Sequence, residues 1–190
     1  FKLGEDKSRS VGMPLVTMVS YAIIYRIGLQ QYVRQAKSAG YAGAIVPDLL
    51  VEEADELLAI CRGEDFSLIQ LVTPTTPRDR QVRIANSSSG FLYYVSVTGI
   101  TGERNELPAD LMENVQWLRR QTELPICIGF GISGAETAKK LAPVADGLIV
   151  GSAIVRRIAQ HADSADASAA VAEFVAELRT AIDSVSSATA

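Results

Sequence analysis

Residues 147–155 read Gly-Leu-Ile-Val-Gly-Ser-Ala-Ile-Val, an apolar run that passes through a glycine and a serine into a stretch with helical spacing. The run from Gly147 to Val150 is typical of a strand that is buried on both faces. Gly151 lets the backbone approach a ligand closely, Ser152 adds a hydroxyl donor, and the start of a helix favours an anion. This stretch therefore predicts a strand, a phosphate-binding turn and a helix in direct succession.

A second glycine turn lies one strand–helix unit earlier, in Gly129-Phe130-Gly131-Ile132-Ser133. Gly131 again offers backbone donors, so the two turns together predict one phosphate site. The alternative is that the glycines merely relieve crowding at two turns. Ser133, with Glu136 three residues later, also fits a capping box for a helix that begins near Ala135.

The same succession of strand and helix repeats along the chain. Between the apolar runs, apolar residues recur at helical intervals, and this alternation predicts a parallel sheet covered by helices. The last helix is expected over residues 165–182. The apolar runs cover residues 14–19, 43–46, 68–72, 91–95, 125–128 and 147–150, and the helical repeats include Tyr32, Val33, Ala36, Ala54, Leu57, Leu58, Cys61, Leu111, Val115 and Leu118.

Six strand–helix units are two fewer than a closed (β/α)8 TIM barrel needs. The chain begins at Phe1 with residues that resemble the tail of a helix, so two further units before Phe1 would restore the count. We therefore expect residues 1–190 to form a single, partial α/β barrel domain that carries strands 3–8. The alternative is an open doubly wound sheet, but the glycine-rich turn usual after its first strand does not follow residues 14–19.

The composition is that of an ordinary globular protein, with 48% hydrophobic and 21% charged residues. The net charge of −4 and the lack of a basic stripe argue against nucleic acid as a partner. Cys61, Cys127 and the single His161 are too few for a zinc site, and reduced thiols in a cytoplasmic protein are expected. No apolar run reaches the ~20 residues that a membrane span requires, so no membrane partner is expected.

Three further features lie where strands are expected to end, which is where barrels hold their functional residues. The loop over residues 96–104 is rich in Gly and Thr and is either a lid over a ligand or an ordinary surface loop. Tyr93 either hydrogen-bonds a ligand or packs in the core. Asp48 is either functional or caps a helix that begins near Val51.

Five motifs in one order resemble the tryptophan synthase α-subunit family. The resemblance covers nearly the whole chain, and the motifs are far more specific together than singly. They are residues 47–49 (Pro-Asp-Leu) followed by residues 52–54 (Glu-Glu-Ala), residues 74–77 (Pro-Thr-Thr-Pro), residues 94–102 (Tyr-Val-Ser-Val-Thr-Gly-Ile-Thr-Gly), residues 129–133, and residues 151–155 (Gly-Ser-Ala-Ile-Val).

The resemblance implies a lyase of tryptophan biosynthesis that splits indole-3-glycerol phosphate into indole and glyceraldehyde 3-phosphate. It implies no cofactor in this subunit, and a pyridoxal-phosphate β subunit as partner in an α2β2 assembly. The family's two catalytic carboxylates match no residue here and are expected upstream of Phe1, so this chain alone should be inactive.

The resemblance also assigns site residues. It maps the phosphate onto Gly102, Gly131, Gly151 and Ser152, and the indole pocket onto Met18, Leu71 and Phe130 with Tyr93 beside them. It puts Thr101 in the closing lid and Asp48 near the lid and the partner interface.

The chain departs from the family pattern at two positions near the expected partner interface. Ala22-Ile23 stands where the family usually has Asn-Pro, and Leu50-Val51 where it has Pro-Pro, which puts affinity for the partner in doubt. Two other functions stay open: another phosphate-binding barrel enzyme of amino-acid biosynthesis, or a barrel that only activates a partner.

Overall fold

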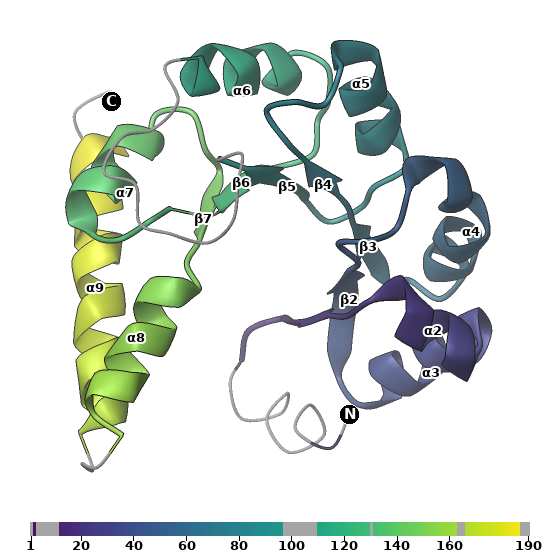
Figure 1. Cartoon of the computed structure of the whole chain (residues 1–190), viewed down its shortest axis with the longest axis horizontal. Helices are drawn as coiled ribbons and strands as arrows, with labels where there is room; N and C mark the ends of the chain where they lie inside the picture. The colour runs from purple at the N-terminus through teal and green to yellow at the C-terminus, as the bar shows by residue number, and fades with distance from the viewer. Residues whose placement is uncertain (1, 3–11, 97–109, 130, 163–165, 187–190) are drawn as a thin grey trace. The chain divides into compact units, whose positions relative to one another are not determined.

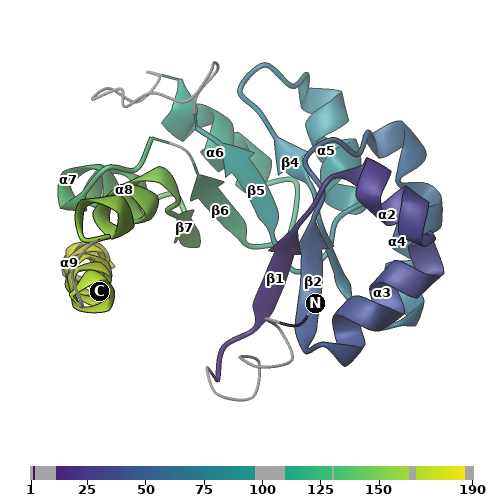
Figure 2. The same ribbon diagram turned by 60° about the horizontal axis from the view of Figure 1, so that its bottom comes forward.

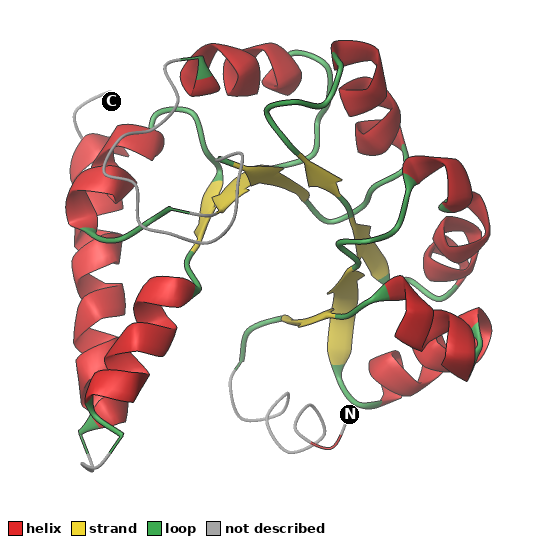
Figure 3. Cartoon of the chain, in the orientation of Figure 1, coloured by secondary structure: helices red, strands yellow, loops and turns green. Residues whose placement is uncertain are grey.

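The computed structural model describes residues 2, 12–96, 110–129, 131–162 and 166–186. Strands and helices alternate along this part of the chain (Figure 3). Contacts divide it into two compact units. The first unit holds Phe1–Val72, Thr76–Tyr93 and Gln121–Leu124, and the second holds Thr73–Thr75, Tyr94–Arg120 and Pro125–Ala190. That residues 1–190 form a single domain stays a prediction.

The first unit is built on a parallel sheet in the order β1-β2-β3. Strands β1 and β2 lie side by side in Figure 2, with a register shift between Leu15 and Val16. Its elements are β1 (Leu15–Met18), α2 (Tyr21–Ile27), α3 (Leu29–Ser38), β2 (Tyr41–Ile45), the 3-10 helix η1 (Val51–Glu53), α4 (Asp55–Gly63), β3 (Ser67–Ile69), β4 (Leu71–Val72), α5 (Arg78–Asn86) and the first half of β5 (Leu92–Val95).

Helices α3 and α4 pack beside each other and against β2 and β3 (Figure 1). The helical spacing selects six residues in these two helices and Ala54 at the N-cap of α4, and all seven are buried in one apolar cluster with Ala44, Val46 and Leu68. Each fully buried aliphatic side chain stabilises the fold by about 1.5–3 kcal/mol. The predicted core of this unit is therefore confirmed.

The second unit contains the second half of β5 and the strands β6 and β7, which pair in parallel. Helices α8 and α9 run beside each other, and α9 also packs on α7 (Figure 1). Phe174, Leu178 and Ala181 of α9 are buried in an apolar cluster that these three helices share. The remaining elements are α6 (Leu111–Arg119), β6 (Ile126–Gly129), α7 (Ala135–Leu141), β7 (Gly147–Ile149), α8 (Ser152–Gln160) and α9 (Ala167–Ser186).

Two local expectations are wrong. The apolar run 68–72 is two strands instead of one, because β3 pairs with β2 whereas β4 pairs with β5. Gln70 lies between them, and its carbonyl accepts a hydrogen bond from the Tyr93 N–H at 3.1 Å. Helix α7 begins at Ala135, as expected, but its N-cap residue is Gly134 and not Ser133. No side-chain hydrogen bond caps this helix.

In the part of the chain that the structure describes, every helix is too short or too polar to cross a membrane.

Candidate functional site

At the start of α8, two backbone donors have no acceptor among the described residues. Gly151 is the N-cap residue, and its carbonyl accepts hydrogen bonds from the N–H groups of Ile154 and Val155 at 2.9 and 3.1 Å. No described residue accepts a bond from the N–H groups of Ser152 or Ala153, and no side chain caps the helix. A Cβ atom added to Gly151 would meet nothing within 4 Å. This helix start is therefore open to an anion, which its dipole and free N–H groups favour.

Gly131 has a backbone conformation that suits glycine. It lies in the turn between β6 and α7 with φ of +76°, in the left-handed region that a side chain disfavours. Two hydrogen bonds hold the end of β6, where this turn begins. The Ser96 N–H and Ser96 Oγ both donate to the Gly129 carbonyl, at 2.9 and 2.8 Å. Gly131 and Gly151, which the sequence predicts to bind phosphate, thus lie in two turns that each follow a β strand of the second unit.

Asp48, in the first unit, binds the start of another helix. Its carboxylate accepts a hydrogen bond from Ser20 Oγ at 2.6 Å and one from the Tyr21 N–H, the first residue of α2, at 2.7 Å. These two bonds, from Ser20 first, hold the pKa of Asp48 below its ordinary value. The expectation that Asp48 caps the helix near Val51 is wrong, because η1 has no side-chain cap. The Asp48 carboxylate instead accepts a hydrogen bond from the first residue of α2.

The predicted indole-pocket residues of the first unit differ in burial. Met18, at the end of β1, is 58% exposed, Leu71 of β4 is half-buried and Tyr93 of β5 is buried. Burial raises the pKa of Tyr93, so its hydroxyl is a neutral donor or acceptor at physiological pH. Their assignment to an indole pocket stays a prediction.

Three predicted site residues, Thr101, Gly102 and Phe130, lie outside the described residues, as does the proposed lid over residues 97–104. Among the residues that are described, no group of three or more His, Cys, Asp or Glu side chains could hold a metal ion. Cys61 and Cys127 are free thiols. Burial raises their pKa to about 12 and about 11 respectively, so neither is a thiolate nucleophile at neutral pH.

Sequence reasoning missed two polar features. Ser20 was not selected, although its hydroxyl binds Asp48, because its partner is 28 residues away in sequence. The Tyr94 hydroxyl is buried without a described hydrogen-bond partner, and burial, with a smaller effect of Asp110, raises the pKa of Tyr94 to about 12. Alternation along β5 could have found Tyr94, because it selects Leu92 and Tyr94 as one face.

Sequence comparison supports the resemblance over most of the chain. A sequence model of the tryptophan synthase alpha chain family matches residues 1–183. The chain is 68% identical over 180 residues to the tryptophan synthase alpha chain of Rhodopirellula baltica, covering 90% of this chain and 65% of that protein. It is 43% identical over 155 residues to the alpha chain of Methanocaldococcus jannaschii, covering 82% of this chain and 55% of that protein. The chain thus spans less than two thirds of the length of these two relatives.

Structural comparison agrees. A chain from the tryptophan synthase α2β2 complex of Pyrococcus furiosus has a TM-score of 0.85 and 32% identity, covering 94% of this chain and 71% of that chain. This match confirms the predicted β/α-barrel fold class. On both sequence and structure, the chain belongs to the tryptophan synthase alpha chain family.

Proposed function

We propose that the protein containing this chain carries out the α reaction of tryptophan synthase, the retro-aldol cleavage of indole-3-glycerol phosphate to indole and glyceraldehyde 3-phosphate. Family membership supports this function. The observation that carries it is the open start of α8, where the Ser152 and Ala153 N–H groups lack described partners and Gly151 adds no side chain. A phosphate ester is the part of this substrate that such a helix start binds best.

In this proposal Gly131, Gly151 and Ser152 bind the phosphate, together with Gly102 from outside the described residues. The backbone N–H groups supply most of the binding, because the helix dipole and the unpaired donors act on the same dianion. The Ser152 hydroxyl is exposed and adds one further donor.

The indole ring is assigned to Met18, Leu71 and Phe130, with Tyr93 as a polar neighbour and Thr101 in the lid. An exposed methionine such as Met18 suits a flat aromatic ligand, because its unbranched, polarisable side chain adapts to ring edges. Asp48 has a supporting role, through the start of α2, and takes no part in proton transfer.

The proton transfers need two positioned carboxylates. None of the carboxylates in this chain is proposed for either role, and the family's acid and base are assigned outside these 190 residues. The 190-residue chain alone is therefore expected to bind a phosphate ester weakly and to release no indole.

The partner that we propose is a tryptophan synthase β subunit, as in the α2β2 complex of the Pyrococcus furiosus relative. The first unit has exposed apolar side chains that such a partner could cover: Ile23, Tyr25 and Leu50 are 52%, 70% and 53% exposed. Exposed apolar side chains mark an interaction surface where they form a contiguous patch. Pyridoxal phosphate is assigned to the β subunit and no cofactor to this chain, and a cytoplasmic location stays a prediction.

The test is an assay of indole release from indole-3-glycerol phosphate by the full-length protein, alone and with its β subunit. Indole release that rises with the β subunit supports the proposal. If the protein releases no indole but still raises the activity of the β subunit, the lyase function is wrong and the partner-activating alternative holds. If it does neither, another phosphate-binding barrel enzyme becomes the better reading.

A further inference from the structure

Ser96 lies directly after β5, in the second unit, and is fully buried. Its N–H and its Oγ both donate to the carbonyl oxygen of Gly129, the last residue of β6, at 2.9 and 2.8 Å. The N–H bond is available to almost any residue, whereas the hydroxyl bond depends on the side chain. Together the two bonds use both lone pairs of the Gly129 carbonyl, and they fix the orientation of this peptide group.

Gly129 belongs to the strand pair from which both glycine turns begin. It pairs with Ile149 of β7 in a parallel register. Gly131 lies two residues beyond Gly129, and Gly151 lies two residues beyond Ile149, so the two turns start from the same level of the sheet. The hydroxyl bond of Ser96 therefore acts at the base of the proposed phosphate site.

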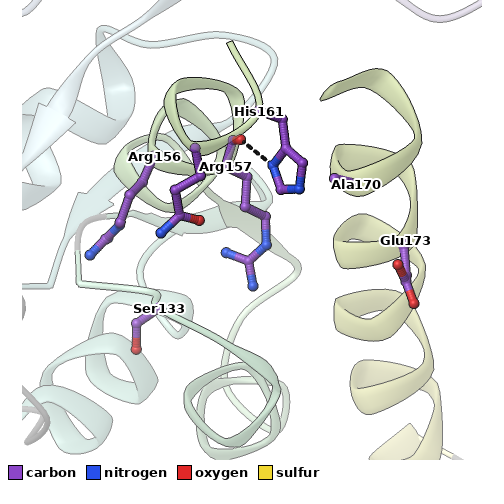
Figure 4. Close-up of a pocket in the computed structure, with 7 residues that line it drawn as sticks. Ser133, Arg156, Arg157, His161, Ala170 and Glu173 are labelled. Carbon is purple, nitrogen blue, oxygen red and sulfur yellow. Dashed lines mark hydrogen bonds between the residues drawn. The ribbon is translucent and has the colours of Figure 1, made fainter. Parts of the chain in front are cut away.

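The Gly131 turn is held on its other side by burial. Ile132 is 5% exposed, and Figure 4 shows Ser133 on the loop that leads on into α7. With the Gly129 carbonyl fixed before it and Ile132 buried after it, Gly131 has little freedom to reorient its backbone. An anion then meets a turn that is already ordered, so binding costs less conformational entropy.

We propose that Ser96 is a positioning residue for the substrate phosphate. Its buried hydroxyl fixes the Gly129 carbonyl and thereby orients the Gly131 turn towards an anion at the start of α8. Ser96 acts through the backbone of β6, so it does not touch the ligand and takes no part in proton transfer. This role rests on the proposed lyase function and adds to it a residue beyond those assigned to the phosphate.

The test compares Ser96→Ala with a matched variant of the full-length protein. Ser88→Ala removes another buried serine hydroxyl, one that donates to the Ile84 carbonyl at 2.7 Å in the first unit. Ser96→Ala should weaken the binding of glycerol 3-phosphate about fivefold, the size of one lost hydrogen bond, and Ser88→Ala should leave it unchanged. Isothermal titration measures both affinities. Equal losses in the two variants, or no loss in Ser96→Ala, would overturn the proposal.

Steady-state kinetics separate positioning from a loss of folded protein. Ser96→Ala should raise KM for indole-3-glycerol phosphate about fivefold and leave kcat within about twofold, because phosphate binding weakens equally in the ground state and the transition state. Partial misfolding would instead lower kcat and leave KM unchanged, and that result would rule out the positioning role.

Backbone NMR of the labelled protein separates a failure of this role from a failure of the proposed function. In the wild type, saturating glycerol 3-phosphate should shift the N–H signals of Gly131 and Ser152. In Ser96→Ala the Gly131 shift should shrink, while the Ser152 shift is retained. The absence of both shifts in the wild type would contradict the phosphate site itself. Wild-type shifts that persist unchanged in Ser96→Ala would contradict only the role of Ser96.

Discussion

The starts of α2 and α8 differ in whether their first backbone N–H groups have a hydrogen-bond acceptor among the described residues. At α2, the first N–H group donates to the Asp48 carboxylate, a side chain from a different part of the same unit. At α8, the N–H groups of Ser152 and Ala153 have no acceptor among the described residues. Both helices follow a parallel β strand, so topology alone does not explain the difference.

The comparison separates a structural helix start from one that is open to a ligand. An internal carboxylate satisfies the donors and stabilises the fold in the absence of any ligand. A glycine at the N-cap without a side-chain acceptor gives up that stabilisation and keeps the donors available for an external anion. Four substitutions or conditions test this contrast, in order of expected effect.

Gly151→Asp should have the largest effect. The new carboxylate stands in for the ligand at the start of α8 and repels a phosphate, so the affinity for glycerol 3-phosphate should fall at least about tenfold, or 1.4 kcal/mol. The fold should survive, because the added Cβ meets open space. Isothermal titration measures the affinity.

The control is Gly63→Asp at the end of α4, in the first unit. Gly63 also has no neighbour within 4 Å of an added Cβ, so this variant introduces the same charge outside the residues assigned to the phosphate. Equal losses of affinity in the two variants would show a general charge effect and not a phosphate site at α8.

Asp48→Ala should have the next largest effect, on stability. Loss of the carboxylate leaves the Tyr21 N–H and the Ser20 hydroxyl without their acceptor, and losses of a helix cap cost about 1 kcal/mol. Solvent screening of this exposed group keeps the value modest. Urea unfolding of the variant and the wild type measures it, and an unchanged midpoint would remove Asp48 as the cap of α2.

The effect of Asp48→Ala should depend on pH. The pKa of Asp48 is lowered in the fold, so its stabilisation is complete above the unfolded value of about 3.9 and is lost as pH falls through the lower, folded value. The difference in unfolding free energy between wild type and variant should therefore be constant from about pH 7 to pH 5 and shrink below about pH 4. A difference that grows on acidification would contradict this assignment.

Ser152→Ala should have the smallest effect. Its hydroxyl is one donor beside several backbone donors that the substitution leaves intact, so the affinity for glycerol 3-phosphate should fall about two- to fivefold. A loss as large as that of Gly151→Asp would mean that the side chain, and not the backbone, binds the phosphate.

The sequence predicted best those features that depend on burial. The helical spacing in α3, α4 and α6 selected residues that are all buried, because an amphipathic helix must turn its apolar stripe to the sheet. The strand runs were found for the same reason. The division of residues 68–72 into β3 and β4 was missed, because an apolar run reports burial and not which neighbouring strand each residue pairs with.

Polar partners were predicted less well. The capping-box pattern at Ser133 is local and consistent, yet Ser133 does not cap α7, because the N-cap residue of α7 is Gly134. Asp48 was selected as a polar residue after the end of a strand, but its partners Ser20 and Tyr21 are distant in sequence and were not predicted. Only the fold brings such groups together, so spacing along the chain does not reveal them.

The most direct test of the contrast follows the backbone N–H signals of the labelled protein by NMR during titration with glycerol 3-phosphate. The account predicts saturable downfield shifts of the Ser152 and Ala153 N–H signals, and no shift of the Tyr21 N–H signal, whose donor is already bound to Asp48. Unmoved Ser152 and Ala153 signals, or an equal shift at Tyr21, would contradict it.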